Sequence, residues 1–157
     1  MKAVIIYFFI VTFVISFGVL EQFDNISEVN QIEKLLNERI NIINDFLYGD
    51  KDDEVLEKLK KDLSEIEDKN LLESDMSLLT YIYNNPTDYE RTTRVRIKEI
   101  KNIEITETSI KILANLEWTV LTGEEELPIE TSLIKDYNID CIFKDKKMYL
   151  TNMKFVE

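Results

Sequence analysis

The chain has 157 residues with no histidine, one cysteine and a net charge of −12, from 31 acidic and 19 basic side chains. The absence of histidine excludes Ser-His-Asp and Cys-His nucleophiles, imidazole bases and His-ligated metals, and a single cysteine excludes an internal disulfide. Gly18, Gly49 and Gly123 lie too far apart for a phosphate-binding loop, and the acidic balance argues against a nucleic-acid partner. The composition therefore predicts neither a cofactor nor a metal site.

Residues 3–20 form an uncharged apolar run, AVIIYFFIVTFVISFGVL. As a helix they span about 27 Å, close to the roughly 30 Å of a bilayer's hydrocarbon core. Lys2 precedes the run and acidic residues follow it, so the positive-inside bias places the N-terminus in the cytoplasm and the C-terminal domain outside. The pattern predicts a single-pass signal anchor in the cell membrane. The alternative is a signal peptide cleaved after Gly18, which would leave a secreted protein.

Residues 24–48 carry the pattern of an amphipathic helix, with apolar side chains at steps of three and four. These side chains are Ile26, Val29, Ile32, Leu36, Ile40, Ile43 and Leu47. Gly49 follows the pattern and can end the helix.

Two further helices are predicted before the first proline. The acidic run Asp50–Asp53 suits the positive end of a helix dipole, so a second helix starts there and can stop at Asn70. A shorter third helix then runs from Ser74, or the residue after it, to Tyr83. Pro86 sets its latest end, because the residue before a proline is biased away from helical backbone.

After Tyr89 the apolar residues alternate with a period of two, which predicts strands. The alternation slips near Ile100, so we expect the first strand to be long and bent, with one bulge. Three more strands are predicted at residues 110–120, 129–143 and 148–156, with a tight turn at Asp145-Lys146 before the last. One face of the third strand carries Ile129, Thr131, Leu133, Tyr137, Ile139, Cys141 and Phe143. Short connections make hairpins, so the strands form an antiparallel meander.

Residues 24–84 are therefore expected to be helical and residues 91–157 to form a sheet, which is an α+β fold of two layers. Two to three helices pack on a four-stranded antiparallel curved sheet, over the face lined by Trp118, Ile112, Ile139 and Phe143. No linker or repeat divides residues 21–157, so we expect one extracytoplasmic domain after a membrane segment at residues 1–20. Acidity concentrates in the helical part, where residues 24–90 hold 18 acidic and 7 basic side chains.

The final strands read IKILANLEWTVLTGEEELPIETSLIKDYNIDCIFKDKKMYLTNMKF over residues 110–155. In element order and texture, residues 24–157 resemble small exported members of the nuclear transport factor two-like (cystatin-like) superfamily. The resemblance implies a cone-like sheet with an open end. Bitopic members of that superfamily include assembly components of type IV secretion and conjugation machines, and other members are isomerases or dehydratases.

The resemblance makes four aromatic side chains candidates for lining a pocket in the cone. They are Tyr81, Tyr83, Trp118 and Tyr137. Cys141 falls on the apolar face of its strand, where a thiol without a histidine partner is inert.

Three carboxylates could act as a base in an enzyme of the cone type: Glu117, Asp136 and Asp140. Glu117 alternates with Trp118, and both aspartates alternate with Tyr137, so the period of two places these acids on the face away from the aromatic residues. We therefore expect exposed carboxylates and no catalytic residue.

The sequence predicts a non-catalytic, membrane-tethered interaction or assembly module outside the cytoplasm. Its partners would be the membrane, through residues 3–20, and a protein of the cell envelope, within an envelope complex or a secretion or conjugation machine; an oligomer is also possible. The alternative is a secreted protein that binds a small ligand, or an isomerase-like enzyme, in the cone pocket.

Overall fold

The computed structural model describes residues 26–50, 54–85, 90–122 and 129–157. The chain divides into two compact units, Met1–Gln31 and Ile32–Glu157. Of the first unit only residues 26–31 are described, and they begin a helix. The predicted membrane segment and its cleavage position at Gly18 lie outside the described residues. Among the helices in the described ranges, none has the length and apolar character needed to cross a bilayer.

The described ranges contain three helices, as predicted: residues 26–48, α2 (Val55–Ser64) and α3 (Lys69–Asn84). The predicted break between the second and third helices was wrong, because Asn70 lies in the first turn of α3 and does not end a helix. The break lies earlier, at residues 65–68, because the last strand forms hydrogen bonds with the backbone of this segment. Glu67 forms an isolated bridge with Leu150, and the Asp68 N–H donates to the Leu150 carbonyl at 2.7 Å.

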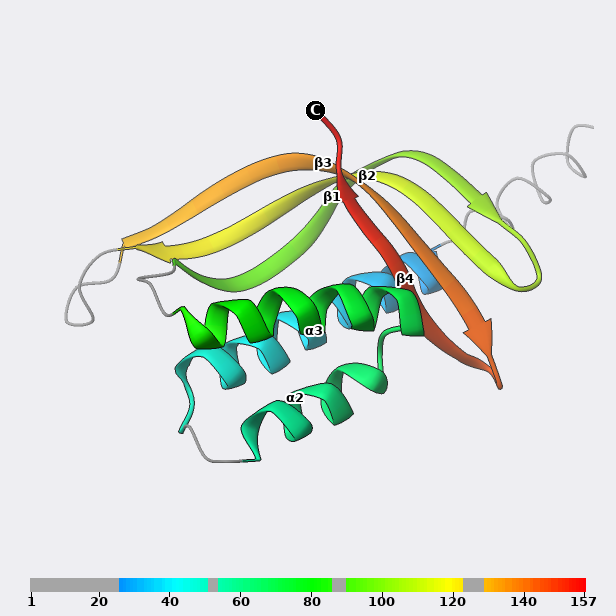
Figure 1. Ribbon diagram of the computed structural model, residues 1–157. Coiled ribbons are helices and arrows are strands. Elements are labelled where there is room, and N and C mark those ends of the chain that lie inside the picture. Colours follow the sequence, from blue (N-terminus) through cyan, green and yellow to red (C-terminus); the bar gives the residue numbers. More distant parts are fainter. Residues whose placement is uncertain (1–25, 51–53, 86–89, 123–128) are drawn as a thin grey trace, which may run out of the picture. The chain divides into compact units, whose positions relative to one another are not determined.

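Four strands form one antiparallel sheet in the order β1-β2-β3-β4, which confirms the predicted meander (Figure 1). They are β1 (Arg91–Ile105), β2 (Ser109–Thr122), β3 (Ile129–Lys144) and β4 (Lys147–Phe155). β1 shifts its register against β2 at three places, where one bulge was predicted. Each shift bends a strand, so together they contribute to the curvature of the sheet. Asp145 and Lys146 have φ of 50° and 65°, as a tight turn of the primed kind requires.

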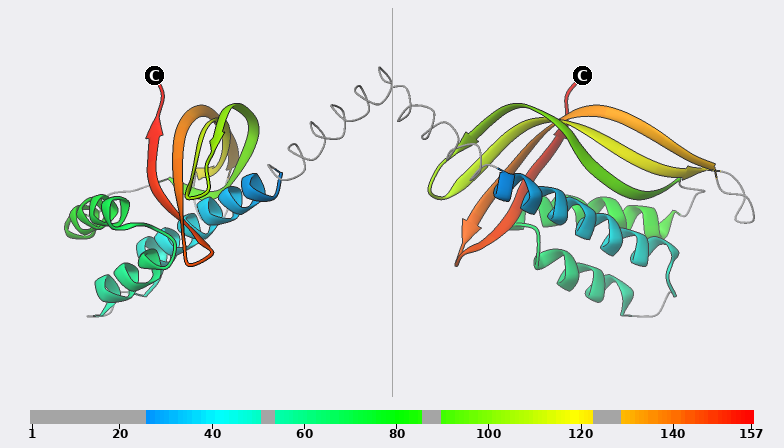
Figure 2. Two further views of the ribbon diagram at one scale, coloured as in Figure 1. Left: turned by 90° about the vertical axis from the view of Figure 1, so that its right-hand side faces the viewer. Right: turned by 180° about the vertical axis from the view of Figure 1, so that it is seen from behind.

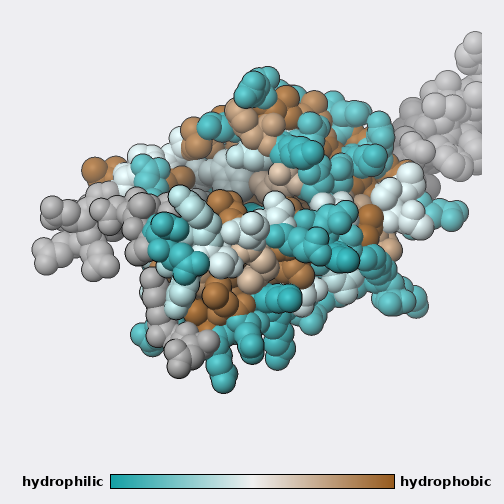
Figure 3. All heavy atoms as spheres, viewed as in Figure 1, coloured by the Kyte–Doolittle hydropathy of each residue, from teal (hydrophilic) through white to brown (hydrophobic). Residues whose placement is uncertain are grey.

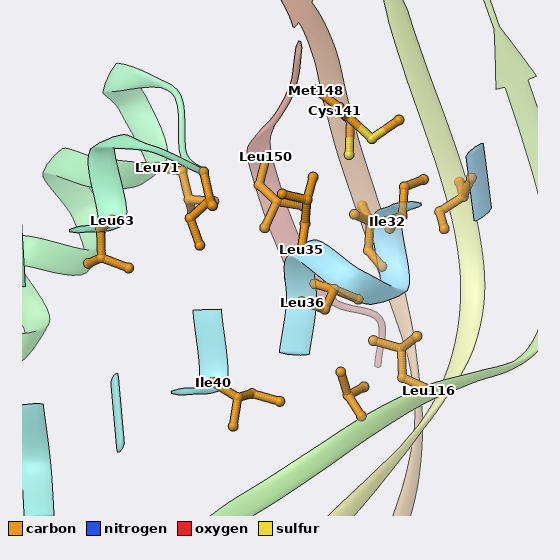
Figure 4. Close-up of a cluster of buried hydrophobic side chains, with 14 of the residues drawn as sticks. Ile32, Leu35, Leu36, Ile40, Leu63, Leu71, Leu116, Cys141, Met148 and Leu150 are labelled. Carbon is orange, nitrogen blue, oxygen red and sulfur yellow. The ribbon is translucent and has the colours of Figure 1, made fainter. Parts of the chain in front are cut away.

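The core of the unit Ile32–Glu157 lies between the helices and one face of the sheet (Figures 1 and 2). Leu36 and Leu63 from the helices belong to one core cluster with Leu116 and Leu150 from the sheet, and all four are at most 2% exposed (Figure 4). Apolar burial of this kind is the main stabilising contribution of a two-layer fold. α2 lies on the side of the helical layer away from the sheet (Figure 1).

Of the four side chains predicted to line the covered face of the sheet, Ile112 and Ile139 are buried. Trp118 and Phe143 are partly buried against the same core. The prediction that the helices cover this face is therefore confirmed for these four positions.

Polar side chains of the first helix close the outer edge of β1. Asn37 accepts from the Val95 N–H at 3.0 Å and donates to the Val95 carbonyl at 2.9 Å, as a residue of a neighbouring strand would. Glu33 accepts from the Ile97 N–H at 2.8 Å, and Asn44 donates to the Thr92 carbonyl at 2.7 Å. These bonds satisfy backbone groups that an edge strand otherwise exposes for pairing with other chains.

Candidate functional site

The opposite edge of the sheet is closed along only half of its length. β4 pairs with Tyr137–Lys144 of β3, and the last contact of the C-terminal segment is a 2.9 Å bond from the Val156 N–H to the Asp136 carbonyl. Before that point, Ile129–Lys135 pairs with β2 on one side, and no strand of the described residues pairs with it on the other (Figures 1 and 2). We call this second side of Ile129–Lys135 the open edge.

The register identifies which backbone groups face the open edge. In an antiparallel strand each residue directs its N–H and its C=O to the same side, and the next residue directs both groups to the opposite side. The Asp136 carbonyl points to the β4 side, and the β2–β3 register runs without a shift, so Glu130, Ser132 and Ile134 direct their backbone groups to the open edge. Three residues thus offer three N–H donors and three carbonyl acceptors there.

Three aliphatic side chains of this segment are exposed to solvent, which is unusual for such apolar residues. Ile129, Leu133 and Ile134 are 63%, 46% and 54% exposed, whereas Ile139 and Cys141 on the same strand are buried. The shared apolar face of the third strand is therefore buried in its second half and exposed at Ile129 and Leu133 in its first half. Apolar side chains also reach the surface between the sheet and α3 (Figure 3). A long apolar edge strand is a site for pairing with another chain.

Aromatic rings line the inner face of the sheet beside the open edge. The Trp118 and Tyr137 ring centroids are 5.5 Å apart, and those of Tyr137 and Phe155 are 5.9 Å apart. The Lys135 Nζ lies 4.9 Å from the Phe155 ring centroid, in cation–π geometry. Burial raises the pKa of the Tyr137 hydroxyl. The Trp118 indole N–H is buried, and none of the described residues accepts a hydrogen bond from it.

The four aromatic residues predicted for a pocket have different surroundings. Trp118 and Tyr137 are neighbours, whereas Tyr83 pairs with Phe46, their ring centroids 5.7 Å apart, and Tyr81 is 65% exposed on α3. Sequence reasoning did not include Phe155 in the site, although its alternation with Met153 on the last strand was a usable signal.

The three carboxylates considered as bases make polar contacts outside the apolar core. Glu117 pairs with Lys98 at 3.5 Å, and Asp140 accepts from the Asn152 amide at 3.1 Å. Asp136 accepts from Lys101 at 2.5 Å and from the Asn115 amide at 2.9 Å. Hydrogen bonds from these two donors hold the pKa of Asp136 below its ordinary value, so it is ionised at neutral pH.

A second polar cluster is buried among the helices. The Arg39 Nε lies 2.9 Å from Glu67 Oε1 and 2.8 Å from Asp75 Oδ2, and both carboxylate residues are at most 6% exposed. Burial and the neighbouring Asp75 raise the pKa of Glu67 to about 8, against the opposing effect of Arg39. The Arg39 guanidinium therefore donates hydrogen bonds to both carboxyl groups. The raised pKa means that Glu67 retains its proton near neutral pH.

Several recesses on the described surface have polar linings, and two of them adjoin the sheet or the first helix. One of about 410 Å³ lies between the end of the first helix and α2, beside Asp45, Lys58 and Arg91. The other, of about 320 Å³, lies on the outer face of the sheet around Asn138 and Asn152. No group of three potential metal ligands occurs within the described ranges.

Cys141 is the one cysteine of the chain, and it is buried with a free thiol. Burial raises its pKa to about 12, so the reactive thiolate is absent at neutral pH. The predicted position on the apolar face is confirmed.

Comparison with known proteins informs the fold alone. No family model and no curated protein matches the chain. Among solved structures, the chain is similar to the intermembrane space region of the chloroplast protein ARC6, with a TM-score of 0.54 and 10% identity over 82% of this chain and 95% of that one. A protein of unknown function from Bacteroides thetaiotaomicron aligns over 83% of this chain and 97% of that one, with 16% identity and a TM-score of 0.37. The first likeness supports an α+β fold with a curved antiparallel sheet.

Proposed function

We propose that the protein is a non-catalytic protein-interaction module that binds its partner at the open edge. The observation that carries the proposal is the contrast between the two edges of the sheet. Side chains of the first helix close the β1 edge, whereas Ile129–Lys135 combines three exposed aliphatic side chains with an edge that no strand of the described residues pairs with. Proteins normally protect such an edge, so leaving one open is consistent with a binding surface.

Membrane tethering and membership of the nuclear transport factor two-like superfamily are part of the same proposal. The uncharged run at residues 3–20 supports a single-pass anchor with the domain outside the cytoplasm, in an envelope complex. The four-stranded curved sheet with three helices is compatible with that superfamily. The intact mass of the protein from the membrane fraction tests the anchor: retention of residues 1–18 supports it, and a mass that begins after Gly18 contradicts it.

Site-specific crosslinking in the native host tests the interaction function. We would replace Leu133 at the open edge with benzoylphenylalanine in the full-length chain, and use Lys60 on α2, which is also exposed, as the matched position. We expect a crosslinked species of defined mass from position 133 and none from position 60. Equal crosslinking from both positions, or none from either, would contradict a partner at the open edge.

The alternative function is a small-ligand carrier or isomerase-like enzyme. The aromatic row of Trp118, Tyr137 and Phe155 is the observation that favours it, because rings beside an orphaned indole N–H can hold an organic ligand. Native mass spectrometry of the protein from its host discriminates the two functions. A bound small molecule that is lost in Tyr137→Ala would favour the carrier or enzyme.

A further inference from the structure

We propose that the partner is an extended basic peptide with alternating apolar side chains, and that it adds to the open edge of β3 as a fifth, antiparallel strand. This inference rests on the proposed function, since it names the partner class and binding geometry of the same site. Its support comes from the backbone groups of β3, the extent of its pairing with β4, the two faces of the strand and the charge of the residues around the edge.

The backbone groups at the open edge can pair with an extended strand but not with a helix. Glu130, Ser132 and Ile134 direct an N–H and a carbonyl to the same side, at the spacing of alternate strand residues. A helix has no free backbone groups along its length to pair with such a row, whereas an extended peptide presents a matching row at the same repeat.

The end of β4 sets the length and direction of the added strand. β4 is antiparallel to β3 and, with Val156, pairs with it from Asp136 onward, so an added strand beside Ile129–Lys135 would lie in line with β4. About seven residues fit beside this segment at one residue per strand position. Antiparallel pairing continues the geometry of the whole sheet, in which every strand pair is antiparallel.

The two faces of β3 specify alternate side chains in the peptide. Inner-face side chains of an added strand lie beside Leu133 and the aromatic row, where apolar residues remove exposed apolar surface from water. Outer-face side chains of the added strand lie beside Glu130 and Ser132, which are both exposed. The peptide therefore alternates apolar and polar residues with a period of two.

Charge selects a basic peptide over a second copy of this chain. Residues 124–136, which include the open edge, hold five acidic side chains and one lysine, so a second copy would bring the same excess of negative charge to the edge, and repulsion would oppose association. A basic peptide is attracted at long range and can place its cations beside Glu130 on the outer face. The polar positions of the peptide are therefore lysine or arginine.

The test uses a fluorescent seven-residue peptide that alternates lysine and valine, with lysine at both ends, and the full-length protein in nanodiscs. In an antiparallel strand with valines on the inner face, the lysine N–H groups face β3 and the valine N–H groups face solvent. N-methylation of the two central lysines should weaken binding at least about tenfold, as expected for lost hydrogen bonds. N-methylation of two valines should weaken binding less than about threefold, and glutamate in place of lysine should abolish it.

Protein variants provide the second measurement. Ser132→Pro removes an N–H at the open edge that β2 does not use, and proline is tolerated at such edge positions. We expect at least about tenfold weaker binding by Ser132→Pro, while the matched Ser132→Thr variant keeps the N–H and the affinity. If Ser132→Pro fails to fold, the N-methylated peptides still decide the question with the unaltered protein.

Several outcomes would overturn the proposal. They are no binding of the lysine–valine peptide, equal losses from both N-methylated peptides, or equal binding of the glutamate peptide. A dimer that Ser132→Pro dissociates would assign the edge to a second copy and also overturn it. A partner crosslinked from position 133 together with equal N-methylation losses would retain the interaction function and reject the added strand.

Discussion

The buried cluster of Arg39, Glu67 and Asp75 predicts an inverse dependence of stability on pH. Glu67 is 3% exposed, its Oε2 has no hydrogen-bond partner among the described residues, and its pKa is raised to about 8 from the ordinary value of 4.5. Burial disfavours the charged form, and Asp75 adds repulsion between like charges. Glu67→Gln keeps the shape of the protonated acid and removes its titration, so it isolates this contribution.

The sign and the size of this change in unfolding free energy follow from the different proton binding of the folded and unfolded states. Between pH 4.5 and about 8 the folded protein holds a proton on Glu67 that the unfolded chain has released. The free energy of unfolding therefore falls as pH rises through this window, by up to about 1.4 kcal/mol per pH unit. From pH 5 to pH 7 the wild type should lose about 2–3 kcal/mol relative to Glu67→Gln.

Urea unfolding of the full-length chain in neutral detergent, followed by the fluorescence of its one tryptophan, measures this difference. The matched control is Glu65→Gln, since Glu65 is exposed and accepts from Lys147 at 2.8 Å. That hydrogen bond lowers the pKa of Glu65, so its contribution is lost only as pH falls below the ordinary range. Parallel stability curves for the wild type and Glu67→Gln between pH 5 and pH 8 would refute the reasoning.

Three further predictions concern packing and reactivity. Gly49→Ala should lower the free energy of unfolding by about 1–3 kcal/mol, because an added Cβ would lie 2.3 Å from the Asp45 carbonyl oxygen; an unchanged urea midpoint would contradict this contact. Leu116→Ala should cost about 2–5 kcal/mol because the side chain is fully buried, whereas Leu78→Ala, at 57% exposure, should change stability by less than about 0.5 kcal/mol in the same urea assay. Cys141 should resist iodoacetamide at pH 8 until urea unfolds the protein, and rapid labelling of the folded protein, followed by mass spectrometry, would contradict its burial.

The helical and strand segments could be predicted because they depend on local periodicity. Steps of three and four residues locate the first helix, and alternation locates the four strands and their meander. The break between α2 and α3 could not be predicted in the same way. It depends on Leu150, which pairs with the backbone at Glu67 and Asp68 from more than 80 residues away.

The candidate site shows the same division. Alternation placed Tyr137 and Trp118 on one face correctly, but could not separate them from Tyr83, which packs against Phe46 in the helical layer. The buried cluster has no local signal, since Arg39 reaches partners 28 and 36 residues away.

By itself, the sequence determined the element types, the antiparallel meander, the acidic character and the exclusion of histidine chemistry, because these depend on composition and on neighbours along the chain. Only the tertiary structure decided which half of β3 is covered. The apolar alternation is the same at Leu133 and at Ile139, yet one is 46% exposed and the other fully buried. Among the described residues, β4 and Val156 pair with β3 only from Asp136 onward, and pairing between strands is a property of the folded chain.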